Sequence, residues 1–421
     1  MATSMRANPE RVAWQVLTVA FVVFLLICLG AVYVAQWYIF QSATDMKVNL
    51  VVSRGTVQLR PANSDEPIAI TDRRDDLRGE ATILTDSTTQ AALTFLDPRT
   101  SDVIASLVVF PDTEIRLVEM AAPRYGLNSN PYVIRASDLS GQLEVLVFDP
   151  SPQSTQFELL SQHASTYISE QGHYTIATNG QNSEITVWDG SAVVDSNGNR
   201  DRIELGRNQH TVIQNTGESI TITDAEIPLV VNHDFSHALD EGWRLYNVGI
   251  PIGNASTTVF DGRPVVIFDR SQGHWPDQAL GHGETGLIQE LQVDVTDYAN
   301  LEIQATLFID EQSLSTCGEA GSECPLMMNI NYIDPAGNEQ EFIHGFYATT
   351  EPQLSYPQAC ASCRSEHERI NLKSWYTYES GNLLELWPAE QRPEYINSIS
   401  VYASGHAYKV FLSDISILAS K

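Results

Sequence analysis

The stretch "SEITVWDGSAVV", from Ser183 to Val194, decides the fold class of this chain. On both sides of Asp189-Gly190, apolar residues alternate with polar ones, which is the period of a half-buried β-strand. Asp-Gly is a dipeptide that favours a turn. The stretch therefore predicts two strands separated by a turn.

The same period of two continues on both sides of this stretch. The runs are rich in Val, Ile and Thr and include "VNLVVSRGTVQLR", "ATILTDSTTQAALTF", "IASLVVF", "EIRLVEM", "GQLEVLVF", "STYISEQGHYTIAT" and "QHTVI". Turn signals such as Asp97-Pro98 and "DSNGNRD" (Asp195–Asp201) separate the runs. No helical pattern of convincing length interrupts them, so they predict an all-β domain over residues 46–223.

A long apolar segment precedes these runs. No charged residue occurs from Val12 to Thr44, and the stretch from Val16 to Val34 has about the length that crosses a roughly 30 Å hydrocarbon core. Trp14 and Trp37 stand near its two edges, where amphipathic rings settle at membrane interfaces. A cleaved signal peptide is the alternative, but its apolar region is shorter than this run. We therefore predict one transmembrane helix over residues 12–40.

The charges around this segment predict its orientation. Arg6 and Arg11 precede the span and Asp45 follows it, and positive charges favour the cytoplasmic side. Residues 1–11 are then a cytoplasmic tail. The protein is expected to be single-pass, with the bulk of the chain outside the cytoplasm.

Six motifs of the first β domain follow one another in a characteristic order: "GTVQL" (55–59), "ILTDSTTQAALTF" (83–95), "FPDTEIRL" (110–117), "GQLEVLV" (141–147), "SEITVWDGSAVV" (183–194) and "IELGRNQHTVI" (203–213). This order resembles the FecR domain. The resemblance implies an extracytoplasmic β domain used for sensing or interaction. FecR regulators bind a sigma factor through a folded cytoplasmic segment, and a tail of residues 1–11 is too short for that role.

A second unit begins after an acidic linker at residues 224–230. It opens with "NHDFSHALDEGW" (232–243), continues with "GLIQELQVDVTDYANLEIQATLFI" (286–309) and closes with "YKVFLSDISIL" (408–418). These segments resemble galactose-binding-like jelly rolls, the fold of many carbohydrate-binding modules. The resemblance implies a β-sandwich over residues 231–421.

Four cysteines fall in this second unit: Cys317, Cys324, Cys360 and Cys363. By the predicted topology they lie outside the cytoplasm, where thiols tend to be oxidised, so we expect disulfides. Four cysteines allow three connectivities, and the sequence does not choose among them. We favour the local pairs Cys317 with Cys324 and Cys360 with Cys363, as staples on two long loops. A four-thiolate zinc site and a redox-active C-x-x-C motif are the alternatives.

Loop aromatics beside polar side chains suit a sugar, because its C–H face stacks on flat rings and its hydroxyls form hydrogen bonds. The residues predicted to contact such a ligand are His274, Trp275, Asp277, Trp375, Tyr376 and Trp387. Each Trp has core packing as its alternative. Asp234 and Asp414 stand near the first and last strands of the sandwich, where jelly rolls of the kind it resembles hold calcium. Oxygen ligands suit this ion, so a structural calcium is the one cofactor considered.

The composition excludes some classes of function. With 53 Asp and Glu against 24 Lys and Arg, the formal net charge is -29, and such a surface repels nucleic acid. The chain has no G-x-S-x-G, no H-E-x-x-H and no phosphate-binding glycine loop, so we do not expect an enzyme.

The sequence therefore predicts a membrane-anchored, outward-facing binding or sensing protein of a bacterial envelope. Its ligand is expected to be carbohydrate or another envelope polymer. The alternatives are a FecR-type signalling component that acts through a membrane protein partner, and an envelope scaffold.

Overall fold

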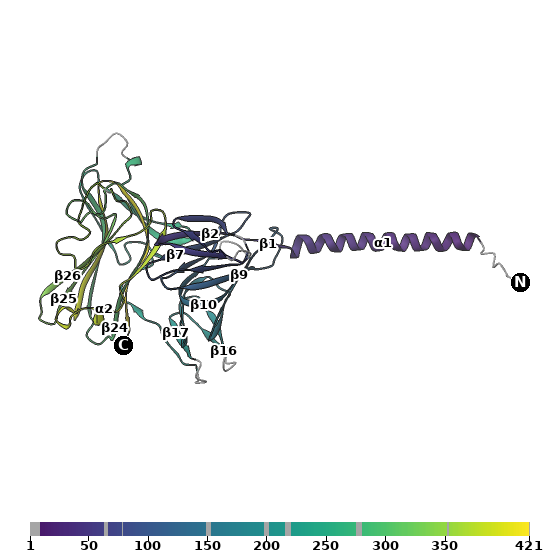
Figure 1. The fold of residues 1–421 in the computed structure, drawn as a ribbon, viewed down its shortest axis with the longest axis horizontal. Helices are drawn as coiled ribbons and strands as arrows, with labels where there is room; N and C mark the ends of the chain where they lie inside the picture. Colours follow the sequence, from purple (N-terminus) through teal and green to yellow (C-terminus); the bar gives the residue numbers. More distant parts are fainter. Residues whose placement is uncertain are drawn as a thin grey trace.

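The computed structural model describes residues 9–62, 66–77, 79–148, 153–197, 202–214, 220–274, 280–351 and 353–420. It begins with a single long helix, α1 (Pro9–Gln41), that leads away from two β units lying side by side (Figure 1). The segment Val12–Gln41 of α1 is long and apolar enough to cross a membrane, by length and composition, and its side chains are exposed in the structure. The predicted fold class, all-β with one N-terminal apolar helix, is confirmed.

The first β unit, called here the N-terminal unit, is built from short strands. They are β1 (Ala43–Asp45), β2 (Lys47–Arg54), β3 (Val57–Pro61), β4 (Ile68–Ile70), β5 (Arg73–Leu77), β6 (Ala81–Leu84), β7 (Gln90–Leu96), β8 (Val103–Val109), β9 (Glu114–Pro123), β10 (Tyr132–Val147), β11 (Thr155–Ser161), β12 (Ala164–Ile168), β13 (Gly172–Thr178), β14 (Asn182–Asp189), β15 (Ala192–Ser196), β16 (Arg202–Leu205), β17 (Gln209–Gln214) and β18 (Ile222–Asp224).

The long strand β10 closes these strands into a barrel. Its first half pairs with β9 and β11, and its second half pairs with β8 and β13. Gly141 lies where the strand changes partners, with φ of 109°, and a Cβ there would be 2.6 Å from Thr113 Cα. Glycine therefore permits a bend that another residue would block. Along β14, Ile185 and Val187 face the barrel core, as the alternation predicted.

The second β unit, called here the sandwich, consists of two sheets. One has the order β21 (Asn254–Phe260), β22 (Arg263–Asp269), β30 (Tyr408–Ser420), β24 (Asn300–Gln312), β28 (Trp375–Glu379), with β19 (Ile227–Pro228) on β30. The other has the order β20 (Arg244–Val248), β23 (Gly283–Asp294), β29 (Tyr395–Gly405), β25 (Leu326–Ile333), β26 (Glu339–Tyr347), β27 (Glu368–Arg369). The described residues of this unit also form short helices: η1 (Gln272–His274), α2 (Leu383–Leu386) and η2 (Ala389–Gln391).

The sheet that contains β24 has one face in the sandwich core and the other toward the N-terminal unit. On β24, Ile303 and Leu307 belong to the core between the two sheets. The intervening Gln304 and Thr306 lie on the opposite face because side chains alternate along a strand. Part of the predicted linker is β19, which pairs with β30 and so joins the sandwich. The face with Gln304 forms the site described next.

Candidate functional site

A cleft runs between the two β units, along the outer face of the sheet that contains β24. It consists of two neighbouring cavities of about 420 Å³ each, which share Trp188, Gln304 and Leu418 in their walls. Trp188 comes from the end of β14, whereas Gln304 and Leu418 come from β24 and β30. Both units are therefore needed to form the cleft.

An apolar patch, called here the inter-unit patch, lies in the interface between the two units, beside the cleft. Its members are Ala92 of the N-terminal unit and Phe260, Val265, Ile267, Phe308, Trp375 and Phe411 of the sandwich. The rings of Phe260 and Phe411 stack with centroids 4.1 Å apart, and those of Phe308 and Trp375 are 5.5 Å apart. Removing these rings from water favours contact between the units.

Hydrogen bonds extend the contact between the units. The Gln90 side chain on β7 donates to the Thr377 carbonyl at 2.9 Å and accepts from the Thr377 backbone N–H at 2.8 Å. The Asn371 amide donates to the Val52 carbonyl at 2.8 Å. The Gln90 amide thus supplies hydrogen-bond partners to the Thr377 backbone groups of the edge strand β28, which would otherwise be buried without partners.

A buried charged cluster separates the inter-unit patch from the cleft. Glu144 Oε1 lies 3.0 Å from His173 Nε2, and Thr377 Oγ1 donates to Glu144 Oε2 at 3.2 Å. The Arg263 guanidinium donates to Ser106 Oγ at 2.9 Å and lies 4.7 Å from the ring centroid of Trp375. Burial alone would raise the pKa of Glu144, but the His173 imidazole 3.0 Å away, the charge of Arg263 and the Thr377 hydroxyl outweigh burial and lower it. Glu144 is therefore a buried carboxylate held ionised by its partners.

Trp188 gives the cleft an aromatic wall. It is half-buried, its Nε1 donates to Thr175 Oγ1 at 3.0 Å, and its ring centroid lies 6.3 Å from that of His173. Groups able to form hydrogen bonds with hydroxyls share the lining of one cavity with it: Gln171, His173, Asp189, Arg207, Asn208, Asp234 and Gln304. A flat ring beside carboxylate, amide and guanidinium groups is the combination that binds sugars.

Polar atoms without protein partners also line this part of the cleft. Ser416 is 1% exposed, and its Oγ has no hydrogen-bond partner; Asp414 Oδ1 has none either. Both residues belong to the lining of the cavity. Buried polar groups are usually satisfied, so these atoms are available to water or to a bound ligand.

The opposite end of the cleft is acidic. Burial and then the neighbouring carboxylates Glu302 and Glu144 raise the pKa of Glu379 to about 8. Burial and then Glu226 raise the pKa of Glu302 to about 7. Gln142 Nε2 donates to Glu379 Oε1 at 3.0 Å across the interface. Like charges that share a site disfavour full ionisation, so this end holds protons near neutral pH.

None of the residues that the sequence assigned to sugar contact, among those that the structure describes, lines this cleft. Trp375 is 5% exposed in the inter-unit patch, and Tyr376 is 6% exposed in the sandwich core with a hydrogen bond to Glu368. That prediction is corrected, because neither ring is accessible for stacking. Trp387 is half-buried, with the Arg364 guanidinium 4.7 Å from its ring centroid.

The remaining residues of that prediction belong to the loop after β22. His274 is exposed, and its Nδ1 lies 3.3 Å from Asp269 Oδ1. Trp275 and Asp277 lie outside the described residues. His274 does not line the cleft, and sugar contact by this loop stays a prediction.

Both residues of the predicted calcium pair do line the cleft. Asp414 Oδ2 lies 2.6 Å from His233 Nδ1, and Asp234 Oδ1 accepts from Ser236 Oγ at 2.8 Å. Within the described residues, no group of three close His, Cys, Asp or Glu ligand atoms includes this pair. Calcium at this position stays a prediction.

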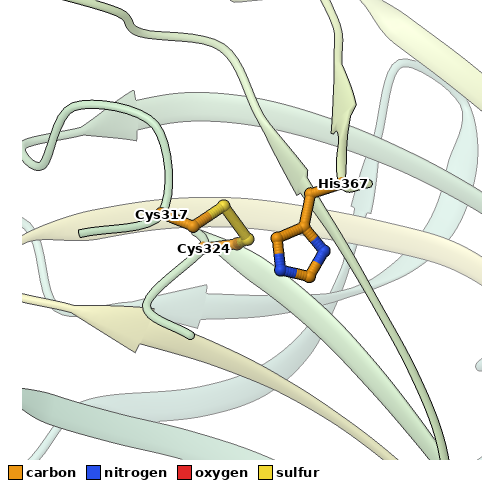
Figure 2. A group of neighbouring side chains, drawn as sticks. All are labelled: Cys317, Cys324 and His367. Carbon is orange, nitrogen blue, oxygen red and sulfur yellow. A yellow bond between two sulfur atoms is a disulfide. The ribbon is translucent and has the colours of Figure 1, made fainter. Parts of the chain in front are cut away.

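The structure pairs Cys317 with Cys324 and Cys360 with Cys363, the local connectivity that we favoured. Figure 2 shows the imidazole of His367 beside the Cys317–Cys324 disulfide. His367 Nε2 lies 3.7 Å from Cys363 Sγ and 2.7 Å from the Gly321 carbonyl, so the same ring also reaches the second disulfide. Thiolates are the ligands that zinc binds, and disulfide sulfurs are not thiolates, so the oxidised cluster does not suit the zinc alternative.

Trp188 is not among the residues predicted from the sequence to contact a ligand, although the sequence carries a signal for it. Ile185 and Val187 point inward, so the alternation in "SEITVWDG" sends Trp188 outward. An outward-facing tryptophan offers a flat ring on which a ligand or another surface can pack.

Comparison with known proteins finds solved structures of low sequence identity to this chain. No protein-family model matches the chain, and no curated protein matches it. A putative anti-sigma factor from Parabacteroides distasonis is 12% identical, with 38% of this chain and 70% of that chain covered and a TM-score of 0.27. The family 11 carbohydrate-binding module of cellulase Lic26A-Cel5E of Clostridium thermocellum is 14% identical, with 45% and 94% covered and a TM-score of 0.25. TmCBM61, in complex with β-1,4-galactotriose, is 12% identical, with 46% and 99% covered and a TM-score of 0.24.

Proposed function

We propose that this protein is a membrane-anchored extracytoplasmic binding protein of a bacterial envelope. It holds a carbohydrate, or another hydroxyl-rich envelope polymer, in the cleft around Trp188 and breaks no bond in doing so. The observation that carries the proposal is the composition of the cleft: one half-buried tryptophan among amide, carboxylate, histidine and arginine side chains, with unpartnered Ser416 and Asp414 oxygens in the same lining. Stacking and hydrogen bonds would supply the affinity.

The test is binding of soluble glycans to the full chain in lipid nanodiscs, measured by calorimetry. Trp188→Ala is expected to abolish binding to any glycan that the unchanged protein binds. Trp387→Ala is the matched control, because Trp387 is also half-buried but lies outside the cleft. Near-ultraviolet circular dichroism verifies that each variant is folded.

Two results would contradict this assignment. If Trp275→Ala abolishes binding and Trp188→Ala does not, the ligand binds the loop after β22 and the cleft is not the site. If the folded chain binds no glycan of a broad panel, the ligand class is wrong.

Signalling through a membrane partner is the second candidate. It is supported by the direct continuation of α1 into β1, with Ser42 as the one residue between them. A ligand in the cleft could then change how α1 associates with a partner helix. Cys28 on α1 is a free, exposed cysteine, so thiol crosslinking at this position, with and without the glycan, measures such a change.

A further inference from the structure

The loop between β9 and β10, residues 124–131, holds the end of α1 against the N-terminal unit. Asn128 is 1% exposed, and its side chain donates to the Ser42 carbonyl at 2.8 Å. Asn130 donates to the Gln41 carbonyl at 3.1 Å. The last carbonyls of a helix have no partner within the helix, so these two amides satisfy groups at the end of α1.

Arg124 and Tyr125 extend this contact to the last turn of the helix. The Arg124 guanidinium donates to the Ala43 carbonyl at 3.1 Å and to the Tyr38 hydroxyl at 3.4 Å, and it lies 5.6 Å from the Tyr38 ring centroid. The Tyr38 and Tyr125 rings meet edge to face with centroids 5.6 Å apart. In addition, β1 pairs with β9, with Ala43 opposite Pro123. The loop is therefore fixed to residues 38–43, at the junction that Figure 1 shows beside β1 and β9.

The length of α1 determines the depth of this junction in a membrane. The apolar segment Val12–Gln41 has 30 residues, and at 1.5 Å per residue it extends about 45 Å, the thickness of a bilayer with its headgroup layers. Tyr38 then lies in the headgroup layer, where Tyr is enriched. Because the loop contacts Tyr38 and Gln41 directly, it lies at the same depth.

The side chains of the loop suit that environment. Leu127 is 72% exposed, more than any other large apolar side chain among the described residues of the N-terminal unit, and Tyr125 is 37% exposed. Arg124 is exposed beside them. An exposed leucine, a tyrosine and an arginine next to a spanning helix form an interfacial anchor: apolar carbon toward the acyl boundary, aromatic ring and cation among the headgroups.

We infer that the loop of residues 124–131 inserts into the headgroup layer of the outer face of the membrane, so that the N-terminal unit rests on the bilayer. This inference depends on the membrane anchoring in the proposed function. It goes beyond that function because it fixes the orientation of the cleft relative to the membrane.

The test uses the full chain in phosphatidylcholine vesicles that contain a lipid spin-labelled near the headgroup. Cys28→Ser removes the one free thiol, since the other four cysteines are paired. A fluorescent label is then placed by Leu127→Cys, or by Leu386→Cys on α2 of the sandwich as the matched control, since Leu386 is 64% exposed. We expect the label at position 127 to be quenched by the spin-labelled lipid and to lose most of its quenching by aqueous iodide. The label at position 386 is expected to show the reverse.

A third label, from Leu26→Cys within α1, distinguishes failure of this inference alone from failure of the membrane anchoring. If the label at 26 is quenched by lipid and the label at 127 by iodide, the loop stays in water: the inference is overturned and the anchoring stands. If both labels are quenched by iodide alone, α1 does not enter the membrane, and the anchoring and the inference are overturned together.

Discussion

The inter-unit patch around Trp375 and the cleft around Trp188 belong to the same interface but bury their tryptophans differently. Trp375 is 5% exposed and packs against Phe308, whereas Trp188 is half-buried and borders open space on both sides. Both lie near a strand terminus, since Trp375 is the first residue of β28 and Trp188 is the second-last residue of β14. The difference teaches that the burial of an outward ring depends on what packs over it. Phe308 and Arg263 pack over Trp375, whereas Trp188 borders the two cavities of the cleft.

The largest expected effect comes from breaking the inter-unit patch. Trp375→Ala removes a buried ring and is expected to lower the free energy of unfolding by about 3–5 kcal/mol. Urea unfolding of the full chain in detergent measures the change. Trp188→Ala is the matched comparison and should have a much smaller effect, because its ring is only half-buried. Equal losses for the two variants would contradict the distinction between patch and cleft.

The buried charged cluster between patch and cleft is the next test. Arg263→Met keeps an unbranched stem near Trp375 but removes a charge that helps to keep Glu144 ionised. A buried carboxylate that loses its cationic partner is strongly destabilising, so we expect a loss on the order of 3 kcal/mol.

Glu144→Gln in the Arg263→Met background serves as the control for that prediction. It removes the uncompensated charge, so the double variant should be more stable than Arg263→Met alone. Additive losses in urea unfolding would show that Glu144 and Arg263 are not coupled.

The acidic end of the cleft predicts a smaller, pH-dependent effect. The pKa of Glu379 is raised to about 8 in the folded protein, above its ordinary value of 4.5. Between these two values the folded state holds a proton that the unfolded state has released, so stability falls as pH rises through this window. Glu379→Gln cannot ionise and should be more stable than the unchanged protein at pH 6, by on the order of 2 kcal/mol, and similar to it near pH 4.5.

Thermal unfolding of both proteins across this pH range measures that effect. Glu366→Gln is the control, because Glu366 is an exposed carboxylate outside the cleft. A constant difference between Glu379→Gln and the unchanged protein at every pH would show that the proton on Glu379 is not its cause.

Local patterns in the sequence were sufficient for the fold class, and they favoured the disulfide partners without deciding them. The alternation around Asp189-Gly190 predicted strands, and Ile185 and Val187 do face a core. The apolar run after Val12 predicted one helix, and short separation along the chain favoured the local cysteine pairs. Each of these features depends on residues close in sequence, whose spacing already determines which side chains share a face or can meet.

The site itself was decided by tertiary structure. The outer faces of β14 and β24 carry Trp188 and Gln304, more than 100 residues apart, and no local pattern places them in one cleft. The same packing buried Trp375, which its own loop context favoured as a ligand contact. A sequence shows which side chains of a strand point away from the core of their own unit, because side chains alternate between the two faces of the strand. Which of them another unit covers depends on the docking of two surfaces, and only the assembled chain determines that.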